Sequence, residues 1–114
     1  MNVVVAHAEV DVLWPDGRRA AVVVAVGQPY RDAEVGAWRC PLSLEGLSPR
    51  LSDVAGDDAL QALLLALRLA HYELAGARTR GARLLHPGAD PNDPDEIFDL
   101  GLYFGNWPQS PASG

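Results

Sequence analysis

The sequence predicts an α+β domain in which an antiparallel sheet of four to five strands, beginning with a β-hairpin, packs on one long α-helix. Apolar residues alternate on both sides of a Pro-Asp-Gly turn within the first 26 residues, and shorter apolar runs follow at 38–44 and 82–86. Residues 57–75 form one long stretch with helical periodicity. With 114 residues, 48% of them hydrophobic, the chain is expected to form a single domain over residues 1–104 and a loosely ordered C-terminal tail over 105–114, in which Trp107 is the residue available to be held.

Residues 3–14 and 18–26 predict the two strands of the hairpin. In the first strand, alternate positions from Val4 to Trp14 are apolar, whereas His7, Glu9 and Asp11 fall on the other face, which is typical of a sheet with one buried face. The turn residues 15–17 supply a proline and a glycine at positions that favour a tight reversal. The second strand carries small apolar residues on both faces, so we expect it to be central and covered on part of both sides.

The remaining strands are predicted from shorter runs. Residues 27–37 are expected to form a loop, and a third strand to run from Trp38 to Leu44 at an edge, because Pro41 cannot donate to a ladder. Residues 45–56 are expected to be a connection and 82–86 a short fourth strand. Residues 87–96 form an acidic loop with several prolines, after which 97–104 return to the sheet or pack on it.

Residues 57–75 predict the helix. Asp58 can accept from the first backbone amides and Gln61 can reach back to an amide, and the helix is expected to end at Gly76 or Gly81. A wheel of 100° per residue predicts that the face packed on the sheet consists of Leu60, Leu63, Leu64, Leu67, Ala70, His71 and Leu74. His71 is therefore expected to be a packed side chain.

The opposite side of this helix is unusually apolar. It carries the candidate interface residues Leu65, Arg68, Leu69 and Tyr72, and exposed apolar patches with tyrosine and arginine mark interfaces. Two interpretations stay open. Either the 27–37 loop or the C-terminal segment covers these residues, or they contact another chain, which is a second copy or a different protein.

Composition limits the partners and the compartment. The net charge of −6 disfavours a nucleic-acid partner, which requires a basic surface, and permits a basic protein partner. No apolar stretch approaches the ~20 residues of a membrane span, and the N-terminus lacks the pattern of a signal peptide. The single Cys40 cannot form an internal disulfide, so we expect a cytoplasmic protein without a membrane partner.

The sequence names no chemistry. His7, Glu9 and Asp11 alternate on one strand face but lack further ligands, so we interpret them as a solvated face and not as a metal site. The acidic 87–96 loop does not have calcium-loop spacing, and Cys40 is expected to be a small core residue. No catalytic residue, metal site or cofactor is predicted.

A resemblance supports this view. The segment Trp38-Arg39-Cys40-Pro41 and the helix start Gly56-Asp57-Asp58-Ala59-Leu60-Gln61-Ala62-Leu63 resemble a family of small bacterial α+β domains of unknown function, with a W-x-C-P strand followed by a G-x-D-x-L-Q-A-L helix. The resemblance covers residues 3–104. It implies a small bacterial cytoplasmic protein and assigns no activity or site residue.

Two functions follow as hypotheses. The first is a non-enzymatic protein-interaction domain of the immunity or adaptor type, which binds through Leu65, Arg68, Leu69 and Tyr72. The second is a small-molecule-binding or enzymatic domain with a pocket between sheet and helix, lined by Trp14, Trp38, His71 and Tyr72.

Overall fold

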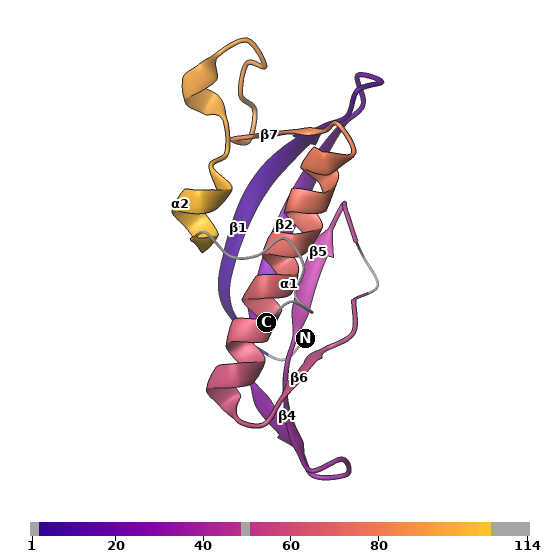
Figure 1. Cartoon of the computed structure of the whole chain (residues 1–114), viewed down its shortest axis with the longest axis vertical. Coiled ribbons are helices and arrows are strands. Elements are labelled where there is room, and N and C mark those ends of the chain that lie inside the picture. Colours follow the sequence, from indigo (N-terminus) through magenta and orange to yellow (C-terminus); the bar gives the residue numbers. More distant parts are fainter. Residues whose placement is uncertain (1–2, 49–50, 106–114) are drawn as a thin grey trace.

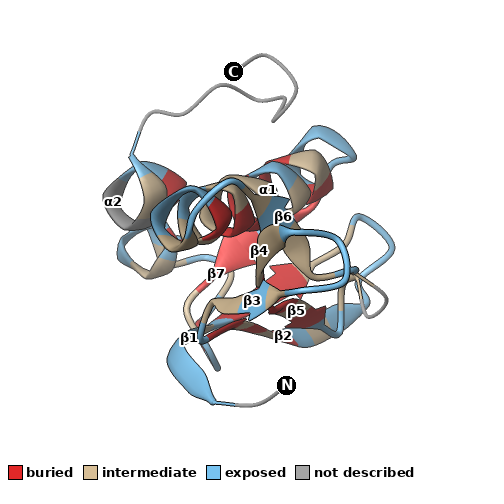
Figure 2. Ribbon diagram, turned by 90° about the horizontal axis from the view of Figure 1, so that it is seen from below, coloured by how far each residue is buried: buried red, intermediate tan, exposed pale blue. Residues whose placement is uncertain are grey.

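The computed structural model describes residues 3–48 and 51–105 and confirms the α+β class (Figure 1). Strands and one long helix form two layers, with the buried residues between them (Figure 2). The elements in chain order are β1 (Val4–Leu13), β2 (Arg19–Gly27), β3 (Tyr30–Asp32), β4 (Ala37–Cys40), β5 (Leu42–Glu45), β6 (Val54–Gly56), α1 (Ala59–Thr79), β7 (Arg83–Leu85), a 3-10 turn at Pro94–Glu96 and α2 (Leu100–Phe104).

The larger sheet has the order β5-β2-β1-β7 and is antiparallel throughout. The predicted hairpin is confirmed: β1 pairs with β2, and Gly17, at φ +90°, donates to the Trp14 carbonyl at 2.9 Å in the turn. The predicted apolar face of β1 is buried in the second half of the strand, at Val10 and Val12; Val4, near a register shift, is exposed. In the central strand β2 the valines at 22, 24 and 26 are buried, and the residues between them are partly covered, as expected.

A second sheet, with the order β3-β4-β6, corrects the prediction of a single sheet. The expected 27–37 loop contains β3, and the expected 45–56 connection contains β6. The expected strand 38–44 is divided at Pro41, so that β4 pairs in the small sheet while β5 pairs with β2. The physical reason is that proline has no N–H to donate, which interrupts the ladder, although the Pro41 carbonyl still accepts from Gly27 N at 2.9 Å.

Helix α1 begins and ends as the sequence predicts. Asp58 is the N-cap and accepts from Gln61 N at 2.7 Å. The Gln61 side chain accepts in turn from Asp57 N at 2.6 Å, one residue before the cap. The helix continues through Gly76 to Thr79, and the C-cap Arg80 is followed by Gly81, whose φ of +94° allows Ala82 N to donate to the Ala77 carbonyl in a Schellman arrangement.

The face that α1 buries differs from the predicted one. The helix packs through an alanine ridge, completed by Leu74 and His71; the buried residues are Ala62, Ala66, Ala70, His71, Leu74, Ala75 and Ala77. Leu60 is 64% exposed and Leu64 is 42% exposed, so their assignment to the core was wrong. Leu63 and Leu67 lie at the margin, half-buried against the core. Alanine at every fourth position lets the helix approach the strands more closely than leucine would, and this turns the larger residues outward.

The close approach is tightest at Gly56, the last residue of β6. A Cβ placed there would lie 2.5 Å from the Ala62 nitrogen and 2.9 Å from its Cα, which are backbone atoms that cannot move independently. The absence of a side chain at position 56 therefore permits the first turn of α1 to rest on the small sheet.

The C-terminal part covers one edge of the molecule. The predicted fourth strand is confirmed as β7, which pairs with residues 11–13 of β1. Ile97 then forms a bridge with Leu85, Phe98 is buried, and α2 packs beside α1, so the segment does return to the domain. The expected tail, including Trp107, lies outside the described residues from position 106 on.

We expect Gly56→Ala to lower the free energy of unfolding by about 2 kcal/mol or more, because the added methyl forces α1 away from β6. Gly76→Ala is the matched control. Gly76 lies inside α1, and the atom nearest to its added Cβ is a flexible Arg80 guanidinium nitrogen at 3.6 Å, so this change should stabilise the protein by about 0.5–1 kcal/mol. Urea unfolding measures both values, and equal effects would contradict the packing described here.

Candidate interaction face on helix α1

The side of α1 that faces away from the strands carries large apolar residues in the open. We define the α1 outer face as Leu60, Leu64, Leu65, Arg68 and Tyr72. Tyr72 is 42% exposed, similar to Leu64, while Leu65 and Arg68 are half-buried. Residues spaced by four form ridges along a helix, and here one ridge runs from Leu60 through Leu64 to Arg68.

A hollow of about 500 Å³ lies beside this ridge. It is lined by residues of α1 and its N-cap: Asp58, Leu60, Gln61, Leu64, Leu65 and Arg68. Its walls are mainly apolar, its N-terminal end carries the Asp58 carboxylate, and Arg68 lies ten residues further along. The arrangement is a shallow groove suited to a side-chain ridge of another polypeptide.

The structure brings together most of the predicted interface residues. Leu65 and Arg68 line the hollow, and Tyr72 is exposed further along the helix, whereas Leu69 packs against the core from its margin. Sequence reasoning missed Leu60 and Leu64, because leucines at helical spacing are normally assigned to a core. The signal that could have found them is the alanine repeat at 62, 66 and 70, which forms a competing, narrower face.

Residues 27–37, which were one expected cover for this side of the helix, do not line the hollow. That segment forms the β3–β4 hairpin, and β4 packs with β6 against the inner side of α1. The other expected cover of this side, the C-terminal segment after Gly105, lies outside the described residues.

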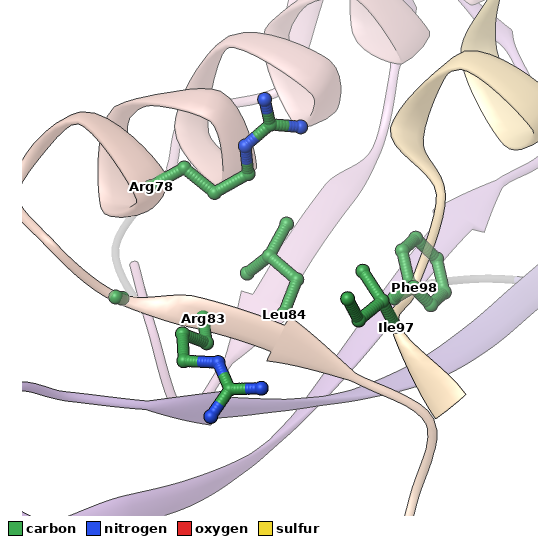
Figure 3. A pocket seen from close by; sticks show the side chains of 6 residues that line it. Arg78, Arg83, Leu84, Ile97 and Phe98 are labelled. Carbon is green, nitrogen blue, oxygen red and sulfur yellow. The ribbon is translucent and has the colours of Figure 1, made fainter. Parts of the chain in front are cut away.

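A second hollow, of about 200 Å³, lies where the C-terminal end of α1 meets β7 and the segment before α2 (Figure 3). Its lining is Arg78, Ala82, Arg83, Leu84, Ile97 and Phe98. Leu84 and Phe98 form an apolar floor and the exposed Arg78 lies above it, while the Arg83 guanidinium points to the other side of β7 (Figure 3) and donates to the Pro91 carbonyl. This site offers a small apolar space with one cation at its rim.

The residues expected to line a sheet–helix pocket are not gathered in one place. Trp14 follows β1 and contacts two guanidinium groups: the Cζ atoms of Arg18 and Arg80 lie 5.4 and 5.5 Å from the centre of its ring. Trp38 belongs to β4, near the opposite end of the molecule from the β1–β2 hairpin (Figure 1). His71 is buried in α1 with its ring 5.9 Å from that of Phe104.

Asp11 corrects the prediction of a fully solvated strand face. His7 and Glu9 are exposed as expected, but Asp11 is only 8% exposed. Its carboxylate accepts from Arg19 Nε at 2.8 Å and from Gly88 N at 3.0 Å. Arg19 also donates to the Ala89 carbonyl at 2.7 Å, so this ion pair holds the loop after β7 on the outer face of the larger sheet.

The other groups with chemical potential also have structural roles. Cys40 is buried, as predicted, with Sγ 3.5 Å from the Gly27 carbonyl, and burial raises the pKa of its thiol. Tyr30 donates to the Asp53 carboxylate at 2.6 Å, a contact that raises the tyrosine pKa and joins β3 to the segment before β6. Among the described residues, no three histidine, cysteine or acidic side chains lie close enough together to hold a metal ion.

The comparisons with known proteins give one result. A family model described as a domain of unknown function, DUF6968, matches residues 8–93, which include both motifs that carried the resemblance noted from the sequence. No curated protein and no solved structure matches the chain. Within the described part of the chain, no helix combines the length and apolarity needed to cross a membrane.

Asp11→Ala is expected to destabilise the protein by about 2 kcal/mol, because it leaves Arg19 and the Gly88 amide without their acceptor. Amide exchange in residues 86–90 should increase in the native state. Asp32→Ala removes a comparable ion pair, in which Asp32 accepts from Arg39 at 2.9 Å. Because the Asp32 carboxylate is more exposed than that of Asp11, this change should destabilise the protein less. Unchanged exchange in the loop would contradict the anchoring role of Asp11.

Stability should depend on pH through His71. Burial, and secondarily the charge of Arg78, lower the pKa of His71 below its usual 6.5, so the unfolded chain takes up this proton at a higher pH than the native protein. The stabilisation is therefore complete above about pH 7 and is lost as the pH falls through the ordinary pKa toward the lowered one. His71→Phe keeps an aromatic ring beside Phe104 and should flatten the decline of unfolding free energy between about pH 7.5 and 5. Parallel curves for both proteins would refute this assignment.

Proposed function

Since the chain belongs to DUF6968, a family whose function is unknown, we propose from its structure that it is a non-enzymatic protein-interaction domain that binds through the α1 outer face. We further propose that it acts in the bacterial cytoplasm as an immunity- or adaptor-type protein. The buried free thiol of Cys40 suits a reducing compartment.

The exposure of Leu60 and Leu64 is the observation that carries this proposal. Both side chains lie on one ridge next to an apolar hollow, with Arg68 and Tyr72 on the same side of the helix. Full burial of a leucine is favourable by about 1.5–3 kcal/mol, so a surface that holds several of them in water gains from a partner. Arginine and tyrosine are, with tryptophan, enriched among the residues that contribute most to binding at interfaces.

The groups that could have supported catalysis have other uses in this structure. Cys40 packs in the core, and Asp11 fixes a loop through Arg19 and Gly88. These roles favour binding over reaction as the function of the domain.

The small hollow at the end of α1 favours a second candidate, the binding of a small molecule. Its apolar floor of Leu84 and Phe98 beneath the Arg78 guanidinium suits a compact apolar group that carries a negative charge. This function does not use the α1 outer face, so a surface variant on α1 distinguishes the two candidates.

Leu64→Glu should abolish capture of the interaction partner while leaving the fold intact, because it places a charge in the middle of the apolar ridge. Val35→Glu is the matched control, since Val35 is 58% exposed in the turn between β3 and β4. Tagged wild-type and variant proteins are compared in a lysate of the source organism, with equal circular dichroism and melting curves as the condition for comparison. Equal capture by all three proteins would refute a role for this face.

A further inference from the structure

We propose that the partner which fits the α1 outer face is a second copy of this chain, packed with its α1 antiparallel across a two-fold axis. The inference rests on the proposed function and specifies its partner. It depends on the distribution of charge and shape along one helix.

The two ends of the hollow carry opposite charges. Asp58 is the N-cap of α1, and Arg68 lies ten residues later, which corresponds to about 15 Å along the axis. The midpoint between them falls at position 63, and Leu60, Leu64 and Leu65 surround it on the outer side. Two antiparallel copies crossing at this midpoint would place Arg68 of each opposite Asp58 of the other, with the leucines between.

This arrangement is self-complementary, as a two-fold interface must be. Each copy offers a ridge, from Leu60 through Leu64 to Arg68, and a hollow beside it, so each ridge can enter the groove of the other copy. Parallel packing would instead set Arg68 against Arg68 and Asp58 against Asp58, which is repulsive. Antiparallel packing also opposes the two helix dipoles favourably.

The size of the face predicts a weak dimer. The residues from Asp58 to Tyr72 extend over about 22 Å of helix, and a contact through one helix per copy lies at the low end of specific interfaces. We therefore expect a dissociation constant in the micromolar range.

Sedimentation equilibrium of the full chain provides the first test. Wild type and Val35→Glu should show the same reversible dimer, and Leu64→Glu should remain monomeric with an unchanged melting curve. A chain that stays monomeric at concentrations well above the micromolar range, or a dimer that Leu64→Glu leaves intact, would overturn the inference.

A double-mutant cycle tests the register. Asp58→Asn retains a good N-cap, and Arg68→Gln keeps a polar side chain, so each removes a charge while preserving the helix. Each should weaken dimerisation roughly fivefold, and the double variant no more than either one alone. Since the two positions are too far apart to touch within one helix, such coupling must arise between copies; full additivity would overturn the antiparallel pairing.

One outcome separates this inference from the proposed function. If the full chain is monomeric but a different protein is captured in a Leu64-dependent manner, the interaction function stands and the second copy is excluded as its partner.

Discussion

Helix α1 approaches the strands through alanine, and most features of the molecule depend on this contact. Ala62, Ala66 and Ala70 lie on the side turned toward the strands, and the Ala62 backbone occupies the space that a side chain at Gly56 would need. Small residues on both sides allow a short distance between helix and strands, and this distance leaves no room for leucine at positions 62, 66 and 70. Leu74, further along the helix, is buried, but the other leucines of α1 lie at the margin or in solvent, so the packing that builds the core also creates the apolar outer face.

The strands form two sheets that lie differently relative to α1. β4 and β6 of the small sheet pack on α1, while β5 continues the larger sheet after Pro41 interrupts the ladder. At the other end of the helix, the Schellman turn at Gly81 passes the chain into β7, close to the β1–β2 turn. The ion pair between Asp11 and Arg19 then holds the next loop on the far side of the larger sheet. Within the described residues, the inner side of α1 is therefore covered by strands, while Leu60, Leu64 and Tyr72 are exposed on its outer side.

This asymmetry is the reason why we propose binding as the function of the domain. Cys40 packs in the core and Asp11 anchors a loop, whereas the exposed side chains of Leu60 and Leu64 on α1 are large, apolar and lie on one ridge beside a hollow. In the proposed dimer, the acid at one end of that hollow and the arginine toward the other would set the direction in which the two helices pack. The net charge of −6 opposes association of two copies. A dimer of this acidic protein therefore needs a contact in which opposite charges face each other.

The sequence by itself determined the elements whose causes are local. The hairpin turn at Gly17, the capping by Asp58 and Gln61 and the fourth strand all follow from neighbouring residues, and all are found. For the helix end, the sequence offered Gly76 and Gly81, and the structure selects Gly81. The tertiary structure decided the features that depend on residues distant in the chain. The division at Pro41 into two sheets required knowledge of which strand lies beside each half, and the burial of Asp11 required a loop that comes 77 residues later. The orientation of α1 was also decided there, because hydrophobic periodicity ranks leucine above alanine, whereas close packing selects by size.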